Sequence, residues 1–98
     1  MSQIQWTQAA LDDLAGIQEY IARDSIYYAE KFVDDIFEAA ERLELFPESG
    51  RMVPERNNPN LREIIFGMYR IIYRLKDHSV CIVTVIHGKR LLPDIDWN

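Results

Sequence analysis

The stretch of residues 61–90 constrains the fold most, because its side chains alternate in character as a β-strand requires. In Tyr69–Lys76 one face carries tyrosine, isoleucine and leucine, whereas the other carries two arginines and a lysine around one isoleucine. Ser79–His87 follows after a two-residue turn, and its residues 80–86 are apolar on both faces, which is typical of a central strand. The stretch therefore predicts a β-hairpin inside a sheet, in which the first strand has one cationic face.

Two helices are predicted before this stretch. The first runs from an N-cap at Thr7 to about Arg23, and Ser25 caps the second, which ends before Pro47. Too little chain separates them for anything but an antiparallel hairpin. The second helix has the clearer pattern, because its acidic residues lie off a single apolar stripe. That stripe consists of Ala29, Phe32, Val33, Ile36, Phe37, Ala40 and Leu43.

The remaining chain completes a two-layer fold. A short strand over residues 4–6 precedes the helices, a polar loop over residues 52–60 follows them, and a further strand is predicted over residues 62–66. We predict an α+β fold, in which this N-terminal strand and the antiparallel helical hairpin pack on one face of a three- to four-stranded antiparallel sheet. The 98 residues form one domain, and residues 91–98 form a C-terminal tail without a sustained period. The other face of the sheet is left open, and its occupant decides the function.

Composition excludes several classes of protein. The single cysteine, Cys81, excludes an internal disulfide and a cysteine-based metal cluster, and its place in a central strand indicates a core residue. The apolar run of residues 80–86 is too short to cross a bilayer, and the N-terminus lacks the pattern of a secretory signal. We therefore expect a cytoplasmic protein without membrane association. We expect no cofactor and no metal, because the acidic residues of the second helix indicate a solvated face.

The net charge of −5 is unevenly distributed along the chain. Residues 1–50 hold eleven acids and three bases, a balance of −8, whereas residues 51–98 hold five acids and eight bases, a balance of +3. Domains that grip RNA are usually basic overall, because counterion release drives much of that affinity. The asymmetry instead favours a cationic sheet that binds an acidic protein partner, and it does not favour direct nucleic-acid binding.

Several motifs occur in an order that is shared with one group of small bacterial proteins. They are Trp6-Thr7 before a helix, Phe46-Pro47-Glu48-Ser49-Gly50-Arg51, Val53-Pro54-Glu55, Tyr69-Arg70-Ile71-Ile72-Tyr73 and His87-Gly88-Lys89-Arg90. In these motifs, which span nearly the whole chain, the sequence resembles the RelE/ParE superfamily of toxins from type II toxin–antitoxin systems. The ParE-like branch is the more similar one.

This resemblance implies a toxin that a cognate antitoxin neutralises, with a disordered antitoxin tail that folds on the toxin. A ParE-like toxin is expected to inhibit DNA gyrase by binding and to serve plasmid stabilisation. One alternative is a ribosome-dependent mRNA interferase, as in the RelE branch, and another is an inactive toxin fold that only binds its antitoxin. The oligomeric state is open between a homodimer and a hetero-oligomer with the antitoxin.

The mRNA interferases of this superfamily use basic residues that stabilise the scissile phosphate, together with a group that transfers a proton. By resemblance, Arg70 and Arg90 stand where two of those arginines are expected, and His87 is the candidate base, with a hydrogen-bonded strand-end residue as its alternative. Leu61 and Glu63 replace the expected lysine pair, and the expected tail tyrosine is absent. Because a glutamate opposes phosphate binding, we favour no catalytic residue.

The residues that we expect to contact the antitoxin or the target are cations and one aromatic residue of the tail. They are Arg51, Arg70, Arg74, Lys76, Lys89, Arg90 and Trp97. A solvated outer face is the alternative interpretation of the cationic strand. For the arginine that follows Gly50, capping of the second helix's carboxyl end is an equal alternative.

Overall fold

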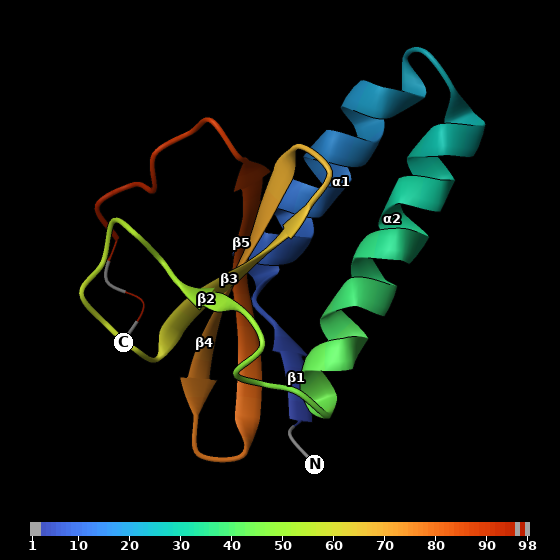
Figure 1. The fold of residues 1–98 in the computed structure, drawn as a ribbon. Helices are drawn as coiled ribbons and strands as arrows, with labels where there is room; N and C mark the ends of the chain where they lie inside the picture. Colours follow the sequence, from blue (N-terminus) through green and yellow to red (C-terminus); the bar gives the residue numbers. More distant parts are fainter. Residues whose placement is uncertain (1–2, 96, 98) are drawn as a thin grey trace.

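The computed structural model describes residues 3–95 and 97, and its helices and strands follow the predicted order along the chain. The elements are β1 (Gln3–Trp6), α1 (Gln8–Ala22), α2 (Ile26–Glu41), the 3-10 turn η1 (Arg42–Glu44), β2 (Arg51–Met52), β3 (Leu61–Phe66), β4 (Tyr69–Lys76) and β5 (Ser79–His87). The two helices form an antiparallel hairpin on one side of a five-stranded sheet with the order β1-β5-β4-β3-β2 (Figure 1). The predicted α+β class is confirmed, and β5 is a central strand as expected.

The sheet has five strands rather than three or four, and it is not wholly antiparallel. β1 lies at one edge and pairs in parallel with β5, from Gln3 beside Ser79 to Trp6 beside Ile82. β2 lies at the other edge and pairs with β3, with Arg51 beside Glu63. The sequence did not predict β2, because a strand of two residues is too short to show a period and borders the predicted polar loop.

Side-chain caps begin both helices where the sequence predicts them. The hydroxyl of Thr7 accepts a hydrogen bond from the Ala10 N–H at 3.0 Å, and the hydroxyl of Ser25 accepts one from the Tyr28 N–H at 3.1 Å. The predicted stripe of α2 faces the sheet, because Ile36 and Ala40 are fully buried and the phenylalanines of the stripe pack against the same core. No helix within residues 3–95 has both the length and the apolar character needed to cross a bilayer.

The sheet carries a hydrophobic cluster on each of its faces, so the expectation of an open second face is wrong. The helix-side cluster is built on Leu14, Ile36, Leu43, Ile71 and Tyr73, among others. The loop-side cluster contains Val53, Leu61, Ile72, Val83 and Leu92, with Cys81, Ile86 and Trp97 packed against it. The loop after β2 and the C-terminal tail cover this second face, because β4 and β5 expose apolar side chains there that water would otherwise contact.

A β-bulge in β5 lies next to a polar contact between α1 and the sheet. Ile72 of β4 pairs with Thr84 while Tyr73 pairs with Ile82, which leaves Val83 as the extra residue. The Thr84 hydroxyl donates a short hydrogen bond to the Asp13 carboxylate of α1, and the Val85 N–H donates to the same oxygen. The Asp13 carboxylate therefore satisfies a buried polar side chain of a central strand next to the bulge.

Candidate interaction site

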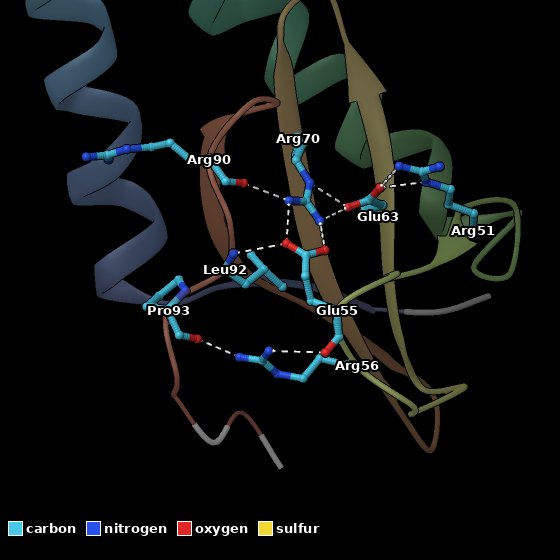
Figure 2. A network of polar contacts seen from close by, with 8 residues as sticks. All are labelled: Arg51, Glu55, Arg56, Glu63, Arg70, Arg90, Leu92 and Pro93. Carbon is cyan, nitrogen blue, oxygen red and sulfur yellow. Dashed lines mark hydrogen bonds and ion pairs between the residues drawn. The ribbon is translucent and has the colours of Figure 1, made fainter.

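The guanidinium of Arg70 is buried beneath the loop-side cover instead of lying on an open face. The residue is only 4% exposed, and its strand places it beside Ile65 of β3 and Ile86 of β5. Its Nε donates to Glu63 at 2.7 Å, and its two Nη atoms form a bidentate pair with Glu55 at 2.8 Å each (Figure 2). Nη1 also donates to the Arg90 carbonyl oxygen at 2.9 Å, and Nη2 lies 2.6 Å from Glu63. Arg70 therefore has no donor left to offer a phosphate or a partner.

The two carboxylates of this network are themselves held in place. The Glu63 side chain is fully buried, and its second oxygen accepts from Nε of Arg51 at 2.6 Å. Glu55, from the loop after β2, accepts the Leu92 N–H at 3.0 Å. The hydrogen bonds from Arg70 lower the pKa of Glu55 to about 2, and both carboxylates raise the pKa of Arg70 further above its already high value. The two arginines and the two glutamates of the network bring equal numbers of positive and negative formal charges, which cancel.

The sequence held a signal for part of this network. The family resemblance marks Glu63 only as a replacement of an expected lysine. In the sheet, Glu63 stands opposite Ile72 and thus diagonally across from Arg70 on the same face. Opposite charges in such cross-strand positions stabilise a sheet. Glu55 belongs to a loop without a period, so its approach to Arg70 could not be deduced from spacing.

The described tail residues, 91–95 and 97, form no strand, and arginine side chains hold their backbone instead. Three arginines from different parts of the chain each donate to one tail carbonyl: Arg70 to Arg90, Arg56 to Pro93, and Arg74 to Trp97. The tail also buries Leu92, which is 8% exposed, in the loop-side cluster. In addition, the Arg56 guanidinium lies 5.7 Å from the centre of the Trp97 ring, a cation–π contact. These contacts fix the tail as the cover of the second face.

An exposed cationic surface lies over the buried network. Arg51, Lys89 and Arg90 border a hollow of about 340 Å³ together with the exposed side chains of Ile65 and Leu91. Four cations and one carboxylate line this hollow, and together with the buried Glu63 that pairs with Arg70 they give a local charge of +2 on a chain of net charge −5. The combination of unpaired cations and exposed apolar side chains is suited to an acidic protein segment.

The predicted binding residues do not all gather at this surface. Arg74 and Lys76 lie toward the far end of β4, where Arg74 pairs with Leu61 and Lys76 pairs with Ser79. Arg74 is committed to the tail carbonyl described above, and Lys76 is exposed. The predicted cationic face is thus divided into a buried arginine, an arginine that clamps the tail and a solvated lysine.

His87 lies on the helix-side face of the sheet and not beside Arg70. It pairs with Tyr69, whose ring centre is 5.6 Å from its own, and its Nδ1 accepts the Lys89 N–H at 3.2 Å. This contact matches the strand-end alternative. His87 and Arg90 line a groove of about 530 Å³ against α1, which Arg70 does not reach. The three candidate nuclease residues therefore do not converge on one site.

A metal site also lacks support within residues 3–95 and 97. No group of three or more histidine, cysteine, aspartate or glutamate side chains converges there in an arrangement that could hold an ion. The acidic residues of α2 are spread along its solvent side, where Lys31 and Arg42 pair with Asp35 and Glu38.

Known proteins similar to this chain agree on its family. The family model for the ParE toxin of the type II toxin–antitoxin system parDE matches residues 4–92. A relative named Toxin RelE2, from Caulobacter vibrioides, is 36% identical over 92 residues, which cover 93% of this chain and 100% of the relative.

Two solved structures share the fold. One is from the chromosomal ParDE system of Pseudomonas aeruginosa, with a TM-score of 0.76, 24% identity, and coverage of 91% of this chain and 98% of that one. The other is from the RelBE2 toxin–antitoxin complex of Mycobacterium tuberculosis, with a TM-score of 0.55, 22% identity, and coverage of 88% and 96%. With the family model matched over most of its length, the chain belongs to the ParE toxins of type II toxin–antitoxin systems.

Proposed function

We propose that this toxin acts by binding DNA gyrase, without cleaving RNA, and that a cognate antitoxin neutralises it. The observation that carries the proposal is the neutralised state of Arg70, which forms contacts of 2.6 to 2.8 Å with two carboxylates. Phosphate cleavage needs unpaired positive charge aimed at the developing negative charge of the transition state. An arginine whose donors are all occupied by protein acceptors cannot supply it.

The exposed surface supports a protein partner. Lys89 and Arg90 have no hydrogen bond or ion pair through their side chains among the described residues, and Leu91 beside them is 81% exposed. A cation next to an exposed leucine suits a segment that carries both acidic and apolar residues. The structural relatives from the ParDE and RelBE2 systems belong to toxin–antitoxin pairs, which supports an antitoxin as one such partner.

A ribosome-dependent mRNA interferase is the second candidate. The relative from Caulobacter is named as a RelE toxin, and His87 and Arg90 share a groove that also contains Asp13 and Tyr69. An imidazole and a guanidinium in one groove can in principle transfer a proton and stabilise charge. This candidate differs from the first in one decisive respect, because it requires His87.

Two assays on the purified protein separate these functions. We expect the wild-type protein to inhibit DNA supercoiling by gyrase and to leave ribosome-bound mRNA intact. In cells, His87→Ala should retain growth arrest, and His78→Ala is its matched control because His78 lies in the turn between β4 and β5. Cleavage of mRNA in the ribosome that His87→Ala abolishes, with folding intact, would establish the interferase instead. Inactivity in both assays would favour an inactive toxin fold that only binds its antitoxin.

A further inference from the structure

Arg90 occupies a junction on the surface of the molecule. It borders the hollow above the buried network, the groove between α1 and β5, and a third groove of about 520 Å³ between α1 and the tail. Its side chain extends toward α1 (Figure 2), and it makes no hydrogen bond or ion pair within the part of the chain that the structure describes. A cation without an internal partner at the meeting point of three hollows is well placed to bind an outside group.

The backbone that carries Arg90 has little support of its own. β5 ends at His87, and the next regular contacts are the Gly88 N–H to the Met68 carbonyl at 2.7 Å and a turn from Arg90 N–H to His87 at 3.0 Å. Beyond that turn, the buried network takes over. Arg70 binds the Arg90 carbonyl at 2.9 Å, and the Glu55 carboxylate binds the Leu92 N–H at 3.0 Å.

These two bonds bracket Leu91. A carbonyl is fixed on one side of it and an N–H on the other, while its side chain is 81% exposed. The bonds come from one bidentate ion pair, Arg70 with Glu55, so a single rigid unit sets the path of the chain through residues 90–92. The network thus fixes the direction in which Arg90 and Leu91 leave the surface.

We propose that Glu55 and Arg70 are positioning residues for a two-part contact surface, in which Arg90 binds an acidic side chain of a partner protein and Leu91 binds an apolar side chain beside it. The chemistry of the partner follows from the local charge of +2 and the exposed leucine. Such a network acts by preorganisation, because a backbone held before binding loses less entropy on binding. The partner half of this proposal rests on the proposed function as a toxin that acts by binding, whereas the positioning half does not.

Amide hydrogen exchange on the whole protein tests the positioning. In Glu55→Gln the Leu92 amide should exchange at least about tenfold faster than in the wild type. The exchange rates of the sheet amides of Ile72 and Val83 should stay close to their wild-type values. Glu55→Asp, which is too short to reach both groups, should do the same and serves where the glutamine variant folds poorly. Arg74→Ala is the matched control, because it removes a different tail clamp, the one on the Trp97 carbonyl, and leaves the bond to the Leu92 N–H in place. Unchanged exchange at Leu92, or equal acceleration throughout the sheet, would overturn the positioning role.

A double-mutant cycle in the growth-arrest assay tests the partner surface. Glu55→Gln should raise the dose needed for arrest by about tenfold in the wild-type background and should have a smaller effect once Arg90→Ala is present, because only Leu91 is then left to be positioned. Arg74→Ala should add to Arg90→Ala independently. Arg90→Lys keeps the positive charge and should largely retain arrest, whereas Arg90→Glu and Leu91→Ser should each weaken it relative to the wild type. Independent, additive effects of Glu55→Gln and Arg90→Ala would refute the coupling. If the wild type causes no arrest, both the proposed function and the partner surface are contradicted. The exchange experiment would still test whether Glu55 and Arg70 position residues 90–92.

Discussion

The two faces of the β-sheet are covered in different ways. On one face the helices α1 and α2 lay apolar stripes over the sheet, and the contact is almost wholly hydrophobic. On the other face a loop and a tail without regular structure cover a smaller cluster, and buried ion pairs and arginine-to-carbonyl bonds hold them there. The contrast shows that an irregular cover depends mainly on specific polar anchors, whereas the helices depend mainly on their apolar stripes, with Asp13 of α1 as a polar addition.

The two covers should fail differently. Hydrophobic burial is non-directional and roughly proportional to area, so one lost side chain leaves most of the helix-side contact in place. A buried ion pair depends on all of its members, because removing one leaves another charge without compensation in a medium of low dielectric constant.

Glu63→Ala should be the most damaging single change. It leaves Arg51 without its carboxylate partner and Arg70 with Glu55 as its one remaining carboxylate, so we expect a loss of about 3–5 kcal/mol in the free energy of unfolding by urea. Glu63→Gln should lose less, because its amide oxygen can still accept one guanidinium. A loss below about 1 kcal/mol for the alanine variant would mean that the second face does not depend on its ion pairs.

Ile36→Ala tests the helix-covered face. The side chain is fully buried, and we expect a loss of about 2–5 kcal/mol from reduced burial and a residual cavity, measured by the same urea titration. Glu38→Ala on the solvent side of α2 is the control and should change the stability by no more than about 0.5 kcal/mol. Similar losses for the two variants would contradict the assignment of the buried face of α2.

Acid should weaken the second face through Glu55. Its pKa is lowered to about 2 from an ordinary value of 4.5, so its contribution is complete above pH 4.5 and is lost as the pH falls toward 2. We expect the wild type to lose roughly 1–3 kcal/mol over that range beyond what Glu55→Gln loses, after allowance for partial exposure. If the stabilities of the wild type and of Glu55→Gln fell in parallel with pH, the Glu55 carboxylate would not contribute to the acid sensitivity.

Arg74→Ala should have the smallest effect among the residues that hold the second cover. It removes one bond of 2.8 Å to the Trp97 carbonyl, worth about 0.5–1.5 kcal/mol. The two tryptophans report on different faces, because Trp6 packs against Phe37 with ring centres 4.8 Å apart and Trp97 lies on the loop side. In single-tryptophan variants, the fluorescence of Trp97 should shift to the red while that of Trp6 stays constant. A shift at Trp6 would show that the faces are coupled.

The contrast between the faces also explains what could be predicted from the sequence. The stripe of α2 and the hairpin of β4 and β5 extend over enough residues to show a period, so their structure and their buried faces were predictable. Alternation along β4 separates its two faces correctly. It does not tell what covers each face, and the cover of the second one comes from loop and tail residues that have no period.

The candidate site was predictable in part for the same reason. Lys89, Arg90 and Arg51 do lie around one hollow, as their shared prediction as binding residues anticipates. Arg70 is on the predicted face of its strand but is buried, because Glu55 approaches from a loop whose path depends on tertiary contacts. Opposite charges far apart in sequence pair in ways that a linear pattern does not encode.

The parallel pairing of β1 with β5 has a consequence for synthesis on the ribosome. Residues 3–6 must wait for residues 79–82 of β5 before they gain this strand partner, and the Thr7 hydroxyl likewise waits for the Val83 carbonyl, 76 positions later. Closing so long a loop is entropically costly, and such distant contacts slow folding. The nascent chain therefore cannot complete its sheet while the ribosome is still making the early strands, and the finished toxin surface arises only after nearly the whole domain has been translated.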